Sequence, residues 1–396
     1  MKIAFLTAGG IAPCLSASIG ALIEKYNQIL PDAELIGYLN GYRGLLLGNI
    51  IRFPEAVKNN YDILYNFGGS PIGNSRVKLT NVEDCVKKGY VKDGENPLEK
   101  AAEQLAKDEV DILHTIGGDD TNTMAAQLSF YLQDHGYDLI VSGLPKTVDN
   151  DVFPVTQTLG AWTAAEQGAI FFENISNENT TSTRQLIIHE VMGRHCGWLT
   201  AQTAFDYRKR MKDRRFLPEL LINKDRWDLD AIYIPEEDFN ISFEAERLKK
   251  KMDEKDGVNI FLSEGAGQEA IIREMKSKGQ EVPTDAFGHV RLDEINPGQW
   301  FAKQFSNLLD AEKTLVQKSG YFARSSKPNK KDLELIKQSA FLGAEQALNG
   351  KSGLIGLDDD HEQKLSLIEF DRIKGGKPFD AQTEWYNNML QEIGQK

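Results

Sequence analysis

The sequence has little cysteine: only Cys14, Cys85 and Cys196 occur in 396 residues. Their number is odd and none is spaced as a CxxC pair, which argues against a disulfide framework or a zinc knuckle. Such a composition fits a reducing compartment, so we expect a cytoplasmic protein.

The sequence also lacks an uninterrupted apolar run of the roughly 18 to 20 residues that a membrane-spanning helix needs. The N-terminal stretch MKIAFLTAGGIAPCLSASIGALI shares a lysine, an apolar part and small residues with signal peptides. Gly9, Gly10 and Pro13 interrupt the apolar part, however. A strand, a glycine turn and a helix therefore explain the stretch better than a secretion signal.

Positive charge is scarce as well, with 46 basic against 59 acidic residues and a net charge of −13. This balance argues against a protein that coats nucleic acid or an anionic membrane. Small anionic substrates are not excluded, because a local cluster of donors can override the net field. The chain is 41% hydrophobic and 27% charged, which is ordinary for a globular protein with a sizeable core.

Short apolar runs alternate with stretches of helical spacing along most of the chain. The runs predict strands at residues 3–6, 110–116, 138–144, 184–191, 231–234 and 258–262. The helical spacing predicts helices at residues 16–26, 123–132 and 159–175, and one that begins near Gly197. This alternation indicates an α/β fold with mostly parallel sheets, in which ligands bind beyond the carboxyl ends of the strands. Residues 67–97, rich in Gly, Asn and Lys, predict a long excursion from this pattern.

The segment GGDDTN, residues 117–122, follows one predicted strand and opens a predicted helix. Two glycines leave backbone N–H groups open to an anion, and the helix N-terminus adds a partial positive charge. A carboxylate beside such a cradle suits Mg²⁺, which accompanies phosphates. Alternatively, Asp119 or Asp120 merely caps the helix; the motif alone leaves both interpretations open.

The segment PKTVDND, residues 145–151, directly follows another predicted strand. Asp149 or Asp151 could act as a general base toward a substrate hydroxyl, with Lys146 placing a positive charge against phosphate. The alternative is a polar turn without chemistry.

Further phosphate donors follow later strands. The segment MGRHCG, residues 192–197, combines a glycine with Arg194, whose guanidinium can grip phosphate through two hydrogen bonds. Glu264 follows the last predicted strand and could accept hydrogen bonds from sugar hydroxyls. Arg291 and Arg324 add cations, whereas His289 or Tyr321, each taken alone, is more often a packing residue.

Five blocks in this order, TAGGIAPC, GGDDTN, PKTVDND, EVMGRHCGWLT and GYFAR, make the chain resemble the phosphofructokinase family, and within it the pyrophosphate-dependent branch. The resemblance covers about residues 7–324. It implies two α/β lobes, each with a mostly parallel sheet, and an active site in the cleft between them. Residues 1–145 would form the lobe with the pyrophosphate and Mg²⁺ site. Residues 146–396 would form the sugar-phosphate lobe, with part of the later chain crossing back to the first.

The resemblance also implies roles for single residues. It makes Asp149 the base toward the 1-hydroxyl of fructose 6-phosphate and Asp119 the ligand of Mg²⁺. The residues it assigns to catalysis are Asp149, Lys146, Asp120 and Arg194. Those it assigns to pyrophosphate are Gly9, Gly10, Arg76, Gly118, Thr121 and Lys146. Those it assigns to the sugar phosphate are Thr147, Val148, Asp149, Asp151, Met192, Gly193, Arg194, Glu264, His289, Arg291, Tyr321 and Arg324.

The phosphoryl donor depends on two positions. ATP-using members resemble GGDGS and PGTIDND, with glycine where this chain has Asp120 and Lys146. Asp120 occupies the volume of a nucleotide α-phosphate and opposes its charge, whereas Lys146 can stabilise the phosphate that leaves pyrophosphate. We therefore predict reversible, Mg²⁺-dependent transfer from pyrophosphate to fructose 6-phosphate, a glycolytic reaction. An ATP-dependent 6-phosphofructokinase and sedoheptulose 7-phosphate as a main substrate are the alternatives. A non-catalytic phosphosugar sensor would fit better if Asp119 or Asp149 were missing, and both are present.

Three departures from the family pattern stand out. Cys14-Leu15-Ser16 replaces the usual glycine–hydrophobe–asparagine, and the usual QRGG run is missing, which leaves Arg291 as its substitute. Where many relatives donate an arginine across a subunit interface, this chain has Gln185, with Arg184 adjacent. The resemblance implies a homodimer or homotetramer.

Overall fold

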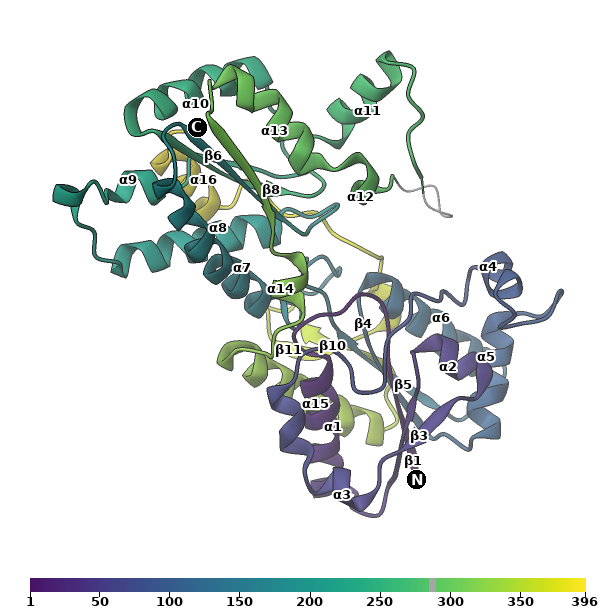
Figure 1. Cartoon of the computed structure of the whole chain (residues 1–396). Coiled ribbons are helices and arrows are strands. Elements are labelled where there is room, and N and C mark those ends of the chain that lie inside the picture. Colours follow the sequence, from purple (N-terminus) through teal and green to yellow (C-terminus); the bar gives the residue numbers. More distant parts are fainter. Residues whose placement is uncertain (285–289) are drawn as a thin grey trace. The chain divides into compact units, whose positions relative to one another are not determined.

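The computed structural model describes residues 1–284 and 290–396, which fold into two compact units (Figure 1). Unit 1 comprises Met1–Thr163 and Arg324–Lys377, and unit 2 comprises Ala164–Ala323 and Pro378–Lys396. The sequence suggested a boundary after residue 145, whereas the first segment of unit 1 continues to Thr163. Asp332 explains this extension, because its buried carboxylate accepts hydrogen bonds from the backbone N–H groups of Gly160 (3.1 Å) and Thr163 (2.7 Å).

Unit 1 contains a seven-stranded sheet in the order β11-β10-β5-β4-β1-β2-β3. Its strands are β1 (Lys2–Thr7), β2 (Glu34–Tyr38), β3 (Ile50–Arg52), β4 (Ile112–Gly117), β5 (Ile140–Pro145), β10 (Gly353–Leu357) and β11 (Leu365–Ile368). The five central strands are parallel, and the edge strands β3 and β11 pair antiparallel with their neighbours. The chain leaves β1 toward β2 on one side and returns to β4 on the other, which is the kind of switch point where α/β sheets bind ligands.

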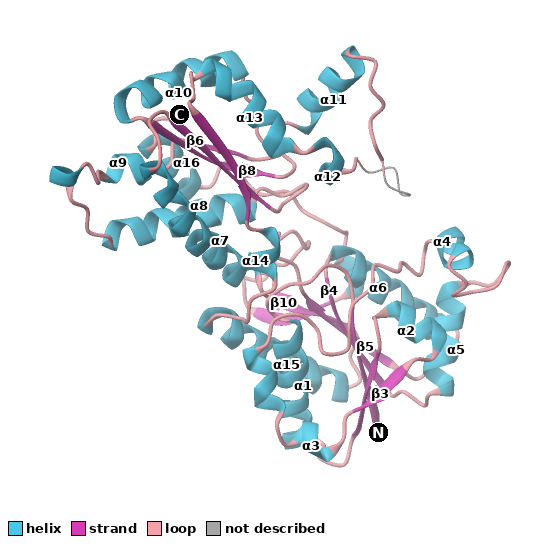
Figure 2. Ribbon diagram, viewed as in Figure 1, coloured by secondary structure: helices cyan, strands magenta, loops and turns pink. Residues whose placement is uncertain are grey.

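Helices cover both faces of this sheet (Figure 2). They are α1 (Leu15–Ile29), α2 (Tyr42–Leu47), α3 (Glu55–Lys58), α4 (Val82–Lys87), α5 (Pro97–Lys107), α6 (Asp119–Asp134) and α15 (Lys330–Leu348), with short 3₁₀ turns η1 (Tyr61–Asn66) and η4 (Phe370–Arg372). Helices α1 and α15 pack together on one face, and α2, α5 and α6 pack on the other (Figure 1). Alternation along β1 matches the two faces, because Ala4 and Leu6 join the core under α5 and α6 while Phe5 lies against His114.

Unit 2 contains a four-stranded, wholly parallel sheet in the order β7-β8-β6-β9. Its strands are β6 (Gln185–Val191), β7 (Ala231–Tyr233), β8 (Gly257–Ser263) and β9 (Lys313–Lys318). Its helical elements are α7 (Ala161–Ile175), η2 (Ser176–Thr180), α8 (Trp198–Asp213), η3 (Pro218–Leu220), α9 (Lys224–Trp227), α10 (Ile241–Lys255), α11 (Gln268–Ser277), α12 (Leu292–Ile295), α13 (Pro297–Leu308), α14 (Gly320–Arg324) and α16 (Glu384–Glu392). Helix α7 begins, and α14 ends, within unit 1.

Strands β6 and β8 are buried along their whole length, as expected for parallel strands covered on both faces. The α/β class, the mostly parallel sheets and every strand and helix predicted from the sequence are confirmed. Residues 67–97 do form an excursion, which contains the short helix α4. Across the described ranges, no helix combines the length and the apolar character needed to cross a bilayer.

Candidate active site

In unit 1, three neighbouring strands end at the same edge of the sheet. The register pairs Thr7 of β1 with Ile116 of β4, and Gly117 of β4 with Pro145 of β5. The segments that follow these ends are those the sequence singled out: Gly9 and Gly10, the GGDDTN turn, and the PKTVDND loop. Parallel pairing therefore gathers residues that lie up to 142 positions apart in the chain.

Lys146 lies at the centre of this edge and is only 3% exposed. Its Nζ donates a hydrogen bond to the carbonyl oxygen of Gly10 at 2.5 Å, and its own N–H donates to the carbonyl oxygen of Gly117. A Cβ on Gly9 would lie 3.3 Å from Nζ, and Gly9 has a φ of +82°, so glycine suits both the turn and the approach of the ammonium group. Burial lowers the pKa of Lys146 to about 8. The nearby charges of Asp151 and Asp149 partly oppose this shift because they raise the pKa.

The loop at residues 69–76 closes over the end of β1. The Thr7 hydroxyl donates to the carbonyl oxygen of Gly73 at 2.8 Å, and Gly9 N–H donates to the carbonyl oxygen of Ser75 at 2.9 Å. The guanidinium of Arg76 lies 4.0 Å from the position that a Cβ on Gly10 would occupy. The structure thus brings Arg76 to the glycine turn, although the side chain stays exposed.

The GGDDTN turn opens helix α6, which begins at Asp119 and has Asp119 and Asp120 in its first turn. Neither aspartate caps the helix, because the N-cap residue is Gly118 and no side-chain cap hydrogen bond is formed. Burial, and then the neighbouring charge of Asp120, raise the pKa of Asp119. Asp120 is 58% exposed and forms an ion pair with Lys78 at 2.8 Å. Thr121 is buried, and a Cβ on Gly9 would lie 3.7 Å from its hydroxyl.

The loop after Lys146 is shaped by Asn150, which has a left-handed backbone (φ +58°), as asparagine tolerates better than most residues. The Asn150 side chain accepts a hydrogen bond from Thr158 N–H at 2.7 Å and donates to the carbonyl oxygen of Thr156 at 3.1 Å. Asp149 N–H donates to the hydroxyl of Thr147 at 3.1 Å. Asn150 therefore anchors the turn between the two aspartates that the sequence proposed as bases. Val148 is buried beside them.

A segment near the end of unit 1 lies along this loop. Lys377 N–H donates to the carbonyl oxygen of Asp151 at 2.7 Å, and Gly376 forms an isolated antiparallel β-bridge with Val152. A Cβ on Gly376 would lie 3.4 Å from that oxygen and 3.6 Å from Oδ2 of Asp119. Asp119 and Asp151 therefore face the same stretch of backbone.

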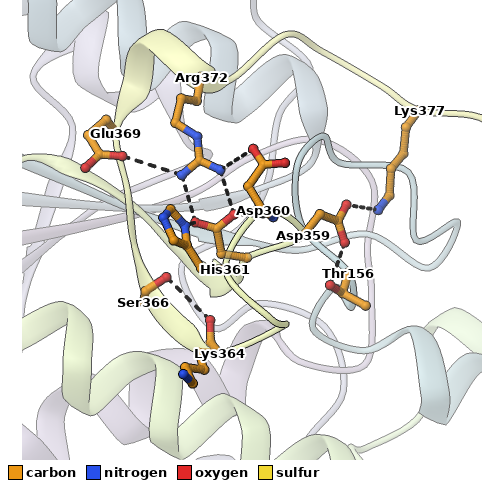
Figure 3. Close-up of polar contacts among 10 residues, drawn as sticks. Thr156, Asp359, Asp360, His361, Lys364, Ser366, Glu369, Arg372 and Lys377 are labelled. Carbon is orange, nitrogen blue, oxygen red and sulfur yellow. Dashed lines mark hydrogen bonds and ion pairs between the residues drawn. The ribbon is translucent and has the colours of Figure 1, made fainter.

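Figure 3 shows the polar contacts that hold this segment. Lys377 forms an ion pair with Asp359 at 2.8 Å, and Asp359 accepts a hydrogen bond from the hydroxyl of Thr156 at 2.6 Å. Arg372 donates two hydrogen bonds to the buried Asp358, at 2.6 and 2.7 Å, which lowers the pKa of that carboxyl. No local pattern in the sequence indicates this network, because Asp358, Asp359, Arg372 and Lys377 lie more than 200 residues from Lys146.

Asp119 and Asp151 fit a divalent cation. Burial, and then Asp119, raise the pKa of Asp151 to about 6, and its buried Oδ1 has no hydrogen-bond partner in the described part of the chain. Among residues 1–284 and 290–396, no group of three or more His, Cys, Asp or Glu side chains could hold a metal. Two carboxylates leave the remaining ligand positions to phosphate oxygens and water, which suits Mg²⁺ better than a metal that needs a complete protein cage.

In unit 2, the Met192–Arg194 turn follows β6 and packs against the turn after β8. Gly193 has a φ of +126°, and a Cβ there would lie 2.4 Å from the carbonyl oxygen of Cys196. The hydroxyl of Ser263 and the N–H of Gly265 both donate to the carbonyl oxygen of Gly193. A Cβ on Gly265 would lie 1.9 Å from the carbonyl oxygen of Arg194. Both glycines are therefore needed for the close packing that presents Arg194 at the end of the sheet.

A cavity of about 490 Å³ lies in unit 2 beside Arg194, a volume typical of small-ligand sites. The loops after β6, β7 and β8 and the first turns of α10 and α11 line it. Arg194 and Arg273 supply positive charge, whereas Glu237, Asp238 and Glu269 supply carboxylates. The lining is therefore mixed in charge and suits a ligand with both phosphate and hydroxyl groups.

Glu264 and Glu190 lie at adjacent strand ends. Burial, and then the charge of Glu190, raise the pKa of Glu264. Glu190 is buried and accepts a hydrogen bond from Gly298 N–H at 3.0 Å, at the start of α13, and it forms an ion pair with Lys318 at 2.8 Å. A Cβ on Gly298 would lie 2.3 Å from Oε2 of Glu190, so only glycine leaves room for this contact. Sequence reasoning missed Glu190 although it opens the EVMGR block, because a strand residue before the turn reads as core.

The remaining sequence-assigned residues are placed differently. Tyr321 is 79% exposed on α14 of unit 2, and Arg324 is half-buried at the end of the same helix, in unit 1. Arg291 precedes α12 and forms an ion pair with Glu294. His289 lies outside the described residues.

Arg184 and Gln185 lie at the amino end of β6, at the opposite end of the strand from Met192. Arg184 donates to the carbonyl oxygens of Asp310 (2.7 Å) and Leu309 (2.6 Å) and pairs with Asp253 at 2.9 Å. Gln185 is buried. Both side chains are therefore engaged within unit 2.

Comparison with known proteins shows the family to which the chain belongs. The family profile described as phosphofructokinase matches residues 2–341. The chain is 58% identical over 394 residues to a protein of Methylomonas methanica named pyrophosphate–fructose 6-phosphate 1-phosphotransferase, covering 100% of this chain and 96% of the relative. A protein of the same name from Propionibacterium freudenreichii subsp. shermanii is 55% identical, with 100% and 98% coverage.

A solved structure supports the fold. The pyrophosphate-dependent phosphofructokinase of Marinobacter aquaeolei superposes with a TM-score of 0.71 at 20% identity, covering 99% of this chain and 91% of that one. The profile match, the two full-length relatives and the shared fold lead to one conclusion: the chain belongs to the phosphofructokinase family.

Proposed function

We propose that this protein transfers a phosphoryl group from pyrophosphate to the 1-hydroxyl of fructose 6-phosphate, giving fructose 1,6-bisphosphate and phosphate. The full-length relatives at 54 to 58% identity carry the name of this activity. The observation that carries the proposal is the buried ammonium group of Lys146, held against the glycine turn by the carbonyl oxygen of Gly10. The two sides of the reaction differ less in energy than they would with ATP as donor, so we expect transfer in both directions.

Pyrophosphate is proposed to bind at the sheet edge of unit 1. Gly9, Gly10, Gly118 and Thr121 supply backbone and hydroxyl contacts, and Arg76 and Lys146 supply positive charge. As the bond between the bridging oxygen and the transferred phosphorus breaks, the departing phosphate gains negative charge. A preorganised, buried cation such as Lys146 stabilises that charge without rearranging solvent.

Asp149 is proposed to accept the proton of the sugar 1-hydroxyl, whose oxygen then forms the new bond to phosphorus. A general base must lie within hydrogen-bond reach of that hydroxyl. The turn anchored by Asn150 and the hydrogen bond from Asp149 N–H to Thr147 hold the backbone of the base in place. Phosphoryl transfer of this kind relies on positioning and charge stabilisation and requires no covalent intermediate.

The proposal includes Mg²⁺, held by Asp119 and Asp151. When bound, the cation would neutralise charge on the phosphate oxygens. The sequence analysis assigned Asp151 to the sugar phosphate. In this proposal Asp151 is also a ligand of the cation.

Within unit 2, the sugar phosphate is proposed to contact Met192, Gly193, Arg194, Glu264 and Tyr321. The resemblance also assigns Thr147, Asp151 and Arg324 to the sugar phosphate. Arg291, the substitute for the missing QRGG run, and His289 are also proposed to contact the sugar phosphate. We further propose a cytoplasmic homodimer or homotetramer, which light scattering of the purified protein would test.

Donor choice provides the test. Initial rates with pyrophosphate and with ATP, each against fructose 6-phosphate and sedoheptulose 7-phosphate, should show a large preference for pyrophosphate. The Asp120→Gly, Lys146→Gly double variant should lose that preference. A wild-type preference for ATP would overturn the interpretation of both positions.

A further inference from the structure

A buried histidine stands at the centre of unit 2. His189 lies in β6, three residues before Met192, and is 0% exposed. Three aromatic rings enclose the imidazole: Phe172 stacks on it at 5.3 Å between ring centroids, Phe171 at 5.5 Å, and Phe261 meets it edge-on at 4.7 Å. The neighbouring β6 positions Ile187 and Ile188 are apolar and equally buried, so an apolar residue would satisfy packing here.

The polar atoms of this imidazole have a single partner in the described part of the chain. Nε2 shares a hydrogen bond of 2.8 Å with the hydroxyl of Ser319, and Nδ1 has no hydrogen-bond partner there. Burial lowers the pKa of His189 to about 3, so the ring is neutral at any pH at which the protein works. An unpaired buried nitrogen is costly, which makes the one hydrogen bond to Ser319 the feature that distinguishes histidine from leucine at this position.

Ser319 is the last residue before α14, the helix that carries Tyr321. Its carbonyl oxygen accepts the N–H of Ala323 at 2.8 Å, the hydrogen bond that closes this helix turn. Phe322 packs against Phe171 at 5.7 Å between centroids, and Phe171 stacks on His189. His189 therefore contacts residues on both sides of Tyr321. It shares a hydrogen bond with Ser319, and it stacks on Phe171, which packs against Phe322. Tyr321 itself is 79% exposed.

We propose that His189 is a positioning residue for sugar-phosphate binding: the His189–Ser319 hydrogen bond holds α14 so that the exposed Tyr321 keeps the orientation that the substrate needs. The inference rests on the proposed function, since it takes the assignment of Tyr321 to the sugar phosphate as given. Tyr321 is carried by a five-residue helix, so the anchor at the start of that helix contributes to the orientation of the Tyr321 side chain.

Unit 1 provides a matched control. His114 in β4 is also 0% exposed, burial also lowers its pKa to about 3, and it also makes one hydrogen bond, from Nε2 to the hydroxyl of Tyr26 at 2.7 Å. Its Nδ1 likewise has no hydrogen-bond partner within the described ranges. Tyr26, however, lies on the buried face of α1, and no residue of that helix is assigned to a substrate. The two histidines thus share chemistry and differ in what their partners carry.

The experiment compares His189→Leu with His114→Leu in the full-length enzyme, with melting temperature and steady-state kinetics for both substrates. Both variants should lower the melting temperature. Only His189→Leu should raise KM for fructose 6-phosphate, by about tenfold, with KM for pyrophosphate unchanged. His189→Gln, whose amide can replace Nε2 in the hydrogen bond, should recover KM to within about threefold. Equal KM for fructose 6-phosphate in the two leucine variants would overturn the proposal.

Ser319→Ala removes the same hydrogen bond with little change in volume, so it serves where His189→Leu does not fold. It should raise KM for fructose 6-phosphate as His189→Leu does, and the double variant should be no worse than either single one. Additive losses would count against the shared hydrogen bond.

Tyr321→Ala separates this inference from the assignment beneath it. If Tyr321→Ala leaves KM for fructose 6-phosphate unchanged, the proposed role of Tyr321 fails. If Tyr321→Ala raises KM while Ser319→Ala does not, only the positioning role fails. Amide hydrogen exchange of the segment 318–324 in the absence of substrate adds a readout independent of activity: Ser319→Ala should speed exchange there, and unchanged exchange would contradict the anchor.

Discussion

In unit 1 the cation proposed to stabilise the departing phosphate, Lys146, is buried and held by a backbone group, whereas in unit 2 two proposed sugar-phosphate residues, Tyr321 and Arg291, are exposed. Lys146 is 3% exposed and bonded to Gly10, while Tyr321 is 79% exposed and depends on the helix that carries it. The difference follows from the two sheets. Three adjacent strands of a seven-stranded sheet end beside Lys146, whereas three of the four strands of unit 2, β6, β7 and β8, end in separate loops around a cavity. We infer that the residues that select the phosphoryl donor are preorganised. The residues that recognise the sugar depend more on side chains that become ordered when the ligand binds.

The largest expected effect tests the base in unit 1. Asp149→Ser should lower kcat by about a thousandfold, because it removes the proposed base, while KM for both substrates changes little. Steady-state kinetics in both directions would measure it. Asp93→Ser, an exposed aspartate of the same unit, is the control and should leave kcat unchanged. Near-normal turnover of Asp149→Ser would show that Asp149 is not the base.

The next effect tests the buried cation. Lys146→Met should lower kcat/KM for pyrophosphate by about a hundredfold, since the departing phosphate loses its partner. The free variant should be no less stable than wild type at pH 7, because burial disfavours the charged form of the lysine. Calorimetry would check this second outcome, and a large loss of stability would mean that Lys146 has a structural role instead.

The pKa of Lys146, lowered to about 8, predicts a pH dependence of about tenfold per pH unit. The free enzyme should lose kcat/KM for pyrophosphate as pH rises above about 8, because the lysine then loses its charge. In the free enzyme, the charged lysine should lower the free energy of unfolding. This destabilisation should be fully present below pH 8 and should fade between pH 8 and the ordinary lysine pKa near 10.5. Lys146→Arg stays charged, so its profile should lack this alkaline limb if the limb belongs to Lys146.

A smaller effect is expected at Asp120. Its ion pair with Lys78 is partly exposed, and such pairs contribute at most about 1 kcal/mol, so Asp120→Gly should leave the melting temperature nearly unchanged. Rates with ATP should rise several-fold as the carboxylate leaves the position of a nucleotide α-phosphate. Initial rates with both donors measure this change. Lys78→Gly is the matched control, because it removes the partner and keeps Asp120, and it should not admit ATP.

The smallest effect is expected in unit 2. Arg291→Ala should raise KM for fructose 6-phosphate by less than about threefold, because the guanidinium is already paired with Glu294. Arg194→Ala should raise the same constant far more. A larger effect at Arg291 than at Arg194 would reverse the proposed order of importance in the sugar-phosphate lobe.

Local sequence was sufficient to predict β6 and β8. β6 and β8 are apolar runs that end in glycine-bearing turns, and the sequence placed both. It did not place β9, whose residues Lys313–Lys318 alternate in polarity and are mostly half-buried, or β10 and β11, which are short. The N-terminal pair β2 and β3 was also missed, since β3 is a three-residue edge strand with polar surroundings.

The sequence by itself determined the α/β class, the strand ends and the residue types placed there, because apolar runs and glycine turns are local signals. Only the tertiary structure decided which of these groups meet. The Asp120–Lys78 pair, Gly376 beside Asp151, and the His189–Ser319 hydrogen bond each join residues 40 to 225 positions apart. Such contacts arise from parallel strand pairing and from loops that return to the same sheet edge, and no local pattern encodes them.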